Sequence, residues 1–182
     1  ALDAALRGSL RAEVRSALAT AGATALLVTH DQDEALSMAD SVAVLQGGRI
    51  ALHDSPVRVY EAPTDLSAAR FLGELVELPA DLVAGRARCA LGDVEVAVAS
   101  GVDEGPVVLG LRPEQLRLGV PGLPGVGGTA GIIRAREYFG HDCLLGIELP
   151  DGSVVRARVA GRPPLADEVQ VYVVGPVRAY AR

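Results

Sequence analysis

The stretch 26-LLVTHDQDEALSMAD-40 decides the fold class, because an apolar run passes into a polar turn and then into a helix start. Residues 25–28 (ALLV) have the composition of a strand that is covered on both faces, as in a parallel sheet. Asp31 is placed to cap a helix whose first turn carries two acidic residues, which suit the positive end of the helix dipole. We therefore expect His30 at the carboxyl end of a strand, the edge of an open α/β sheet where ligands usually bind.

A lone histidine at a strand end is most simply a partly buried, hydrogen-bonded side chain, so the neighbouring motifs decide its interpretation. These motifs are THDQDEA at 29–35, MAD at 38–40, an apolar strand, GGRI at 47–50 and a Pro-x-x-x-Tyr segment at 56–60. Their order and spacing, over about fifty residues, closely resemble the switch-histidine region of the ATP-binding subunits of ABC transporters.

The segment before this stretch is expected to form a helix over residues 4–20, which Gly22 is placed to end. Its apolar side chains recur every four residues and its arginines share a neighbouring face: Leu6, Leu10, Val14 and Leu18, and Arg7, Arg11 and Arg15. We expect Arg7 and Arg11 to be solvated. Beyond His30, the pattern predicts helix 31–38, a hairpin of strands 41–45 and 50–53, and helices 56–60 and 65–71.

From residue 74 onward, short β-rich runs separated by Gly, Pro and Asp replace the helical periodicity. The expected strands are 86–91, 94–99, 107–112, 116–118, 129–138, 144–149, 154–159 and 168–174, with turns at Gly92-Asp93 and Asp151-Gly152. This spacing predicts a small sandwich or barrel, with an oligonucleotide-binding-like (OB-like) barrel as the first choice. No nucleic-acid partner is expected, because the net charge is -6 and single-strand binders need a basic groove with stacking aromatics.

The second half carries a resemblance of its own. Arg112-Pro113-Glu114, preceded by Leu111, resembles the Arg-Pro-Glu signature of the transport-associated OB-like (TOBE) domain appended to many importer ATPases. The segments 71-FLGE-74, 110-GLRPEQ-115 and 138-YFGHD-142 look most like the ferric-iron importer branch. Sugar and polyamine importers share the overall plan and remain alternatives.

The composition sets further bounds. All 17 basic residues are arginine, so the chain cannot contain a P-loop of the form GxxxxGK[ST], whose lysine reaches the nucleotide phosphates. No apolar run approaches the roughly 18 residues needed to span a bilayer, so we expect a soluble, intracellular chain. Cys89 and Cys143 are far apart, which favours free buried thiols over a zinc site or a disulfide.

The resemblance implies a fold of two parts: an α/β fragment over 1–71, which is the carboxyl-terminal part of an ABC-type P-loop ATPase domain, and an all-β OB-like TOBE barrel over 72–182. It implies that His30 contacts the γ-phosphate of ATP and helps to position the attacking water. It also implies that Asp3 reaches across a homodimer toward the opposite P-loop. In the complete subunit, ATP and Mg²⁺ would be the cofactors and transmembrane permease subunits the partners, at the cytoplasmic face of a bacterial cell membrane.

The resemblance has two consequences, and one alternative function remains beside it. The chain alone is expected to be inactive as an ATPase, and strand 25–28 is expected to expose apolar surface if its sheet neighbours are missing. The alternative is a function of a different class, in which the barrel acts purely as a regulatory or dimerisation module.

Overall fold

The computed structural model describes residues 4–121, 128–175 and 177–182. The chain divides into two compact units, Ala1–Gly73 and Glu74–Arg182, a division that falls two residues after the boundary expected from the sequence. Each unit is described by itself.

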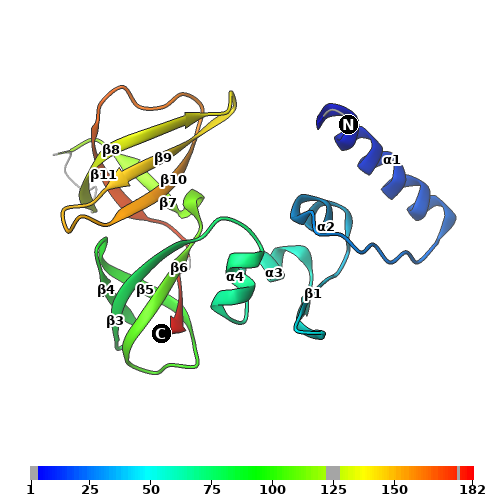
Figure 1. Cartoon of the computed structure of the whole chain (residues 1–182), viewed down its shortest axis with the longest axis horizontal. Helices are drawn as coiled ribbons and strands as arrows, with labels where there is room; N and C mark the ends of the chain where they lie inside the picture. Colours follow the sequence, from blue (N-terminus) through cyan, green and yellow to red (C-terminus); the bar gives the residue numbers. More distant parts are fainter. Residues whose placement is uncertain (1–3, 122–127, 176) are drawn as a thin grey trace. The chain divides into compact units, whose positions relative to one another are not determined.

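The first unit contains α1 (Ala4–Ala21), α2 (Gln32–Met38), β1 (Val42–Gln46), β2 (Arg49–Asp54), α3 (Pro56–Glu61) and α4 (Leu66–Phe71) (Figure 1). These bounds agree with the expected ones to within one or two residues. β1 and β2 form the predicted antiparallel hairpin, and the turn places Gly47 and Gly48 at φ +55° and +76°, a region that glycine enters at little cost. The buried core of this unit is small and consists of Val42, Val44, Val59 and Leu72.

The strand expected over residues 25–28 does not form, and that prediction is wrong. The segment is irregular, and the side chains of Leu26 and Val28 are 92% and 87% exposed. A strand of a parallel sheet is stabilised by backbone hydrogen bonds to its neighbours and by cover on both faces. In the described part of the first unit, the only sheet is the hairpin of β1 and β2, and residues 25–28 do not join it.

The second unit contains a closed five-stranded barrel, which confirms the expected OB-like fold class. The strand order is β12-β5-β4-β3-β6, formed by β3 (Val76–Val83), β4 (Arg86–Cys89), β5 (Gly92–Ser100), β6 (Gly105–Leu111) and β12 (Val177–Ala181). β12 closes the barrel by pairing parallel to β5 and antiparallel to β6. β3 and β12 were not predicted from the sequence, and the turn expected at Gly92-Asp93 lies instead at residues 90–91.

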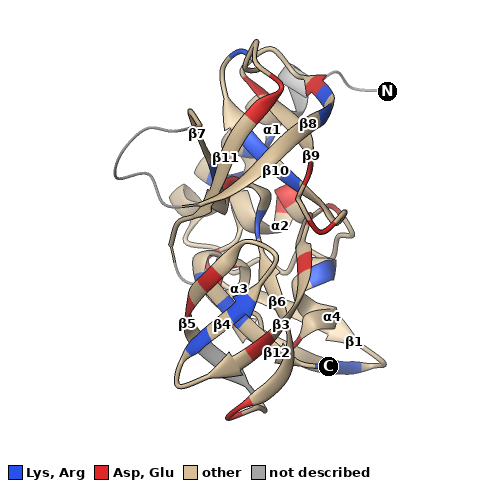
Figure 2. Ribbon diagram, turned by 90° about the vertical axis from the view of Figure 1, so that its left-hand side faces the viewer, with Lys and Arg blue, Asp and Glu red and all other residues tan. Residues whose placement is uncertain are grey.

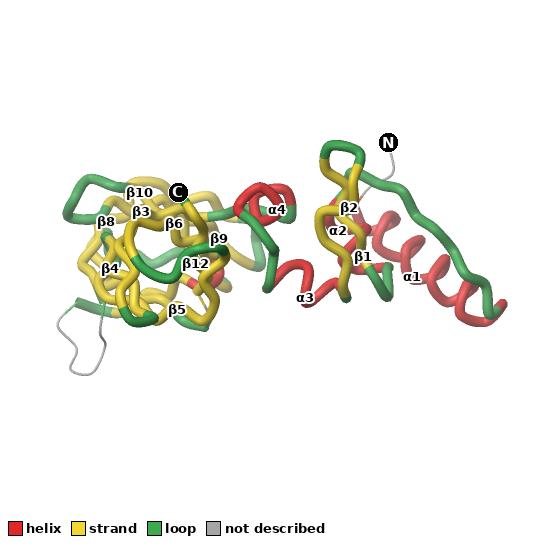
Figure 3. Tube along the Cα trace, turned by 90° about the horizontal axis from the view of Figure 1, so that it is seen from below, coloured by secondary structure: helices red, strands yellow, loops and turns green. Residues whose placement is uncertain are grey.

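A second five-stranded sheet has the strand order β10-β9-β8-β11-β7. Figure 3 shows the strands of the second unit in yellow and the helices of the first unit in red. The strands of this second sheet are β7 (Leu116–Gly119), β8 (Thr129–Tyr138), β9 (Asp142–Glu148), β10 (Val154–Ala160) and β11 (Glu168–Val173). One hydrophobic cluster includes residues of the barrel and of this sheet, among them the fully buried Leu109, Ile147 and Val171. The turn predicted at Asp151-Gly152 is confirmed, with Gly152 at φ +84°.

The Arg-Pro-Glu motif lies where the barrel passes into the second sheet, at the short 3₁₀ helix η1 (Pro113–Gln115). Arg112 is only 6% exposed, and its Nη1 donates a hydrogen bond to the carbonyl oxygen of Glu74, at 3.1 Å. Its backbone N–H donates to Oε1 of Gln115, at 2.8 Å. A buried guanidinium must find hydrogen-bond acceptors, so this arginine ties the start of the unit to the middle of it.

Charged side chains of both signs are interspersed on the barrel strands (Figure 2). Arg88 of β4, for example, lies 3.3 Å from Asp93 of β5. Such exposed pairs contribute little to stability, typically below about 1 kcal/mol each.

Candidate functional site

His30 lies on a tight turn that leads into α2, and its side chain is exposed. The backbone N–H of Asp31 donates to Oγ1 of Thr29 at 2.9 Å, and that hydroxyl donates to Oε2 of Glu34, also at 2.9 Å. The N–H of Glu34 donates in turn to Oδ1 of Asp31 at 3.1 Å, which confirms the predicted helix cap. The residues on both sides of His30 are therefore fixed by hydrogen bonds.

The imidazole itself is available for a ligand. Within the described ranges, no hydrogen bond or ion pair joins the His30 ring to another residue of the chain. A neutral imidazole presents one N–H donor and one acceptor, and a protonated imidazole presents two donors. The turn can therefore offer a donor to an anionic group that approaches from solvent.

Arg11 of α1 approaches this turn from a distant part of the sequence. Its Nη2 lies 3.2 Å from Oδ2 of Asp31 and 3.6 Å from Oε1 of Glu34. The expectation that Arg11 is solvated is therefore wrong, since its side chain is only 24% exposed. No sequence pattern predicts this contact, because it depends on how α1 packs against α2. The side chain of Arg7 lies outside the described part of the chain.

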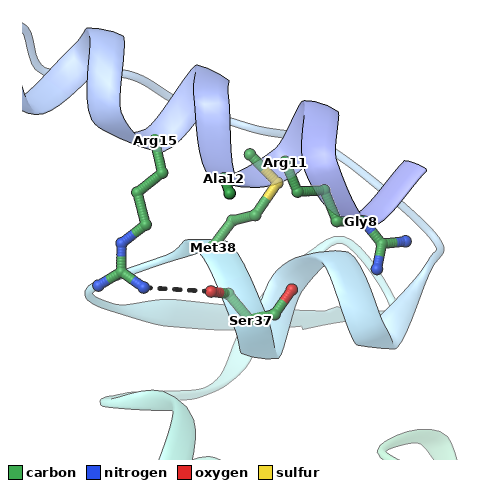
Figure 4. A pocket seen from close by; sticks show the side chains of 6 residues that line it. All are labelled: Gly8, Arg11, Ala12, Arg15, Ser37 and Met38. Carbon is green, nitrogen blue, oxygen red and sulfur yellow. Dashed lines mark hydrogen bonds between the residues drawn. The ribbon is translucent and has the colours of Figure 1, made fainter. Parts of the chain in front are cut away.

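A groove of about 330 Å³ lies between α1 and α2. It is lined by Gly8, Arg11, Ala12, Arg15, Ser37 and Met38 (Figure 4). Nη1 of Arg15 donates to the carbonyl oxygen of Ser37 at 3.3 Å, and its Nη2 lies 3.7 Å from Asp40. Both arginines of the groove are thus engaged with α2 or the residues beside it, which leaves the groove without a cation directed at a ligand.

Asp3, the second site residue expected from the sequence, lies outside the described residues. The structure therefore does not test whether Asp3 and His30 act on the same nucleotide. Among the residues that the structure describes, no group of three or more His, Cys, Asp or Glu side chains could hold a metal ion.

A cluster of charged residues in the second unit was not anticipated. Arg156 and Arg158 of β10 contact Glu74 at 2.6 and 3.8 Å, and Arg158 also binds Asp142 at 2.8 Å. The hydrogen bond that Arg158 donates to Oδ2 of Asp142 is the main reason that the pKa of Arg158 is raised above its ordinary value. Two arginines at positions i and i+2 of a strand point to the same face, and this spacing was the available signal. The cations are paired within the cluster, so it does not present free charge to a ligand.

Comparisons with known proteins first define the class of the second unit. The family model of the TOBE domain matches residues 109–177, which run from β6 to the start of β12.

The relatives then extend the match to the whole chain. The chain is 45% identical, over 99% of its length, to "Fe(3+) ions import ATP-binding protein FbpC 1" of Rhodococcus jostii (strain RHA1) and covers 52% of that protein. It is 40% identical, over 100% of its length, to the FbpC protein of Pseudomonas fluorescens (strain Pf0-1) and covers 53% of it. The chain thus spans about half the length of the curated relatives it matches. Over its whole length the chain is therefore similar to Fe(3+) ions import ATP-binding proteins, and its residues 109–177 match the TOBE domain, in agreement with the resemblance of the sequence motifs.

In the described residues, no helix is both long enough and apolar enough to cross a membrane.

Proposed function

We propose that this chain is the carboxyl-terminal portion of the ATP-hydrolysing subunit of an ABC importer for ferric iron. The observation that carries the proposal is the exposed His30 on a turn fixed by Thr29, Asp31 and Glu34. The similarity to Fe(3+) import ATP-binding proteins supports both the reaction class and the solute. The subunit would pair with a second copy and with transmembrane permease subunits, at the cytoplasmic face of the cell membrane.

His30 would act as a hydrogen-bond donor to the γ-phosphate and would help to orient the attacking water. Phosphoryl transfer concentrates charge on the phosphate oxygens, so a donor already in place stabilises the transition state more than mobile water does. The bound Mg·ATP supplies the reacting phosphoryl group and charge neutralisation. Asp3 would extend across the dimer toward the opposite P-loop.

The test is the ATPase rate of the complete subunit that contains this sequence. His30→Ala should lower turnover by roughly 10² or more, as expected for loss of a positioned donor. His53→Ala is the matched control, because His53 is exposed on β2 and its ring contacts Ser41 at 2.8 Å, away from the turn. Turnover of the His30 variant within about threefold of the parent would contradict the proposal.

The solute is tested separately from the chemistry. In cells that depend on this importer, uptake of labelled ferric iron should fall with His30→Ala, while uptake of labelled sugars and polyamines should be unaffected. Loss of sugar or polyamine uptake instead would reassign the solute and leave the ATPase proposal intact.

The chain alone, at 182 residues, should not hydrolyse ATP, because it has no lysine with which to build a P-loop. The expected result is no turnover of Mg·ATP above that of its own His30→Ala variant. Turnover that the substitution abolishes would contradict the view that this is an incomplete ATPase.

A role in assembly or regulation is the second candidate, and the separate hydrophobic core of Glu74–Arg182 favours it. Sedimentation of this unit at several concentrations shows whether it forms a dimer or stays a monomer. A stable dimer supports assembly through the barrel, whereas a monomer assigns assembly to other parts of the subunit.

A further inference from the structure

We propose that Arg11 is a positioning residue for His30: it holds the turn of His30 in place through Asp31 and Glu34, although it does not touch the histidine. This inference rests on the proposed role of His30. It concerns a residue 19 positions earlier in the sequence, on a different helix.

The first step is the chain of contacts. One nitrogen of Arg11, Nη2, lies within 3.2 Å of Asp31 and 3.6 Å of Glu34. The other oxygen of Asp31 caps α2, and the other oxygen of Glu34 accepts the hydroxyl hydrogen of Thr29. In each carboxylate, one oxygen therefore lies near Arg11, and the other accepts a hydrogen bond, from the N–H of Glu34 for Asp31 and from the hydroxyl of Thr29 for Glu34.

The second step is electrostatic. Asp31 caps α2 and Glu34 lies in the first turn of that helix, and their side chains are only about one third exposed, at 34% and 32%. Both carboxylates lie within 3.6 Å of Arg11, and two such carboxylates repel each other unless a cation lies between them. Without Arg11, the least costly response is for Glu34 to swing into solvent, which releases the hydroxyl of Thr29. The N–H of Asp31 then loses a fixed acceptor, and the backbone of His30 is no longer held on either side.

The third step is the comparison with Arg15, which lies one turn further along α1. Arg15 also reaches α2, but its partners are the carbonyl of Ser37 and the carboxylate of Asp40, which is 99% exposed. These partners lie at the far end of α2 from His30. Arg15 thus shares with Arg11 the residue type, the helix and the packing against α2, but it lacks the connection to the turn (Figure 4).

A catalytic group that drifts by about 1 Å can lose on the order of 10²-fold in rate while substrate binding is retained. In the complete subunit, Arg11→Ala should therefore lower kcat by roughly tenfold or more and leave the KM for ATP within about twofold. Arg11→Lys should restore part of the rate, because it returns the charge without the fork of donors. Arg15→Ala should stay within about twofold of the parent in kcat.

The decisive experiment combines Arg11→Ala with His30→Ala. If Arg11 acts through His30, the double variant should be no slower than His30→Ala alone. Effects that multiply, or an Arg11→Ala variant with unchanged kcat, would overturn the inference.

A second measurement does not depend on catalysis, and it uses the 182-residue chain itself. Amide hydrogen exchange followed by NMR should speed up at Asp31 and Glu34 by about tenfold or more in Arg11→Ala, and by less than about twofold in Arg15→Ala. Unchanged exchange at both amides would overturn the inference even if His30 proves essential. Normal turnover of His30→Ala together with faster exchange would refute the proposed function and keep the positional role of Arg11.

Discussion

At the scale of single residues, Asp31 caps α2 as predicted, because a helix cap depends on neighbours a few positions away. The role of His30 stays a prediction that rests on the sequence motifs. The sequence could not identify the contacts of Arg11, since an arginine on an amphipathic helix is solvated unless another element packs over it. The partners of Arg11 lie 20 and 23 positions further on, and only the packing of α1 against α2 brings them close.

The carboxylate of Asp151 makes a pH-dependent contribution to stability. The hydroxyl and the N–H of Ser153 both donate to its Oδ1, at 2.6 and 2.9 Å, and these bonds lower the pKa of Asp151. A lowered pKa in the folded state means that the contribution is complete above the unfolded value of about 3.9. It is lost as the pH falls through the lower, folded value.

The prediction is that Asp151→Ala destabilises the protein at pH 6, and that the difference from the parent shrinks as the pH falls from about 4 downward. Urea unfolding at a series of pH values measures this difference. Ser153→Ala, which removes one of the two donors, should show a smaller difference at pH 6. A difference that grows on acidification would contradict the assignment.

The two cysteines should differ in reactivity. Cys143 is fully buried in β9, and burial raises the pKa of its thiol. Burial also raises the pKa of the Cys89 thiol, but this residue lies at the end of β4 and is only partly buried. Because the thiolate is the reactive form, Cys143 should be labelled only when the unit opens.

The expected outcome with a disulfide reagent at pH 8 is one thiol that reacts without unfolding, at a rate reduced by its raised pKa, and a second that reacts more slowly, at the rate of unfolding. The Cys89→Ala variant should retain only the slow phase, and Cys143→Ala only the fast one. Equal rates for the two thiols in the native protein would be inconsistent with the burial of Cys143.

At the scale of elements, local signals were sufficient where an element is stabilised by its own residues. The four-residue apolar spacing predicted α1, and Gly47-Gly48 predicted the hairpin of β1 and β2. The local signals failed where tertiary contacts decide whether a strand forms. β3 contains Pro79, and a proline argues against a strand because it has no N–H to donate to a neighbouring strand. The strand forms nevertheless, because the pairing of β3 with β4 begins only after Pro79, at Ala80. Residues 25–28 show the opposite failure, since their strand-like composition has no sheet to join.

The helix α4 offers a test of capping with a built-in comparison. The side chain of Asp65 accepts a hydrogen bond from the N–H of Ala68 at 2.8 Å, whereas Ser55, at the same position of α3, makes no such bond. Asp65→Ala should therefore lower the free energy of unfolding of the first unit by about 1 kcal/mol. Ser55→Ala should change it by less than about 0.5 kcal/mol.

Chemical denaturation, followed by the NMR signals of the first unit, measures both effects. Equal losses in the two variants would mean that the side-chain bond of Asp65 does not stabilise α4.

At the scale of the whole molecule, the two units differ in the size of their hydrophobic cores. Leu109 of β6 is completely buried within a cluster that includes residues of the barrel and of the second sheet. Leu109→Ala should lower the free energy of unfolding of Glu74–Arg182 by about 2–5 kcal/mol, the usual cost of a large cavity in a core. The hairpin signals of the first unit should remain native at denaturant concentrations that unfold the variant barrel.

The control for this substitution is Val83→Ala, at the exposed end of β3, which should cost less than about 0.5 kcal/mol. Simultaneous loss of the signals of both units in the Leu109 variant would mean that the two cores are not independent.

The closure of the barrel by β12 has a consequence for biosynthesis. β5 and β6 leave the ribosome early, but their shared partner follows only after residues 112–176 have been made. Until then, each of the two strands presents a row of unpaired backbone groups, the kind of edge at which chains pair wrongly with one another. We therefore expect the nascent barrel to be open to wrong pairing for as long as the second sheet takes to emerge.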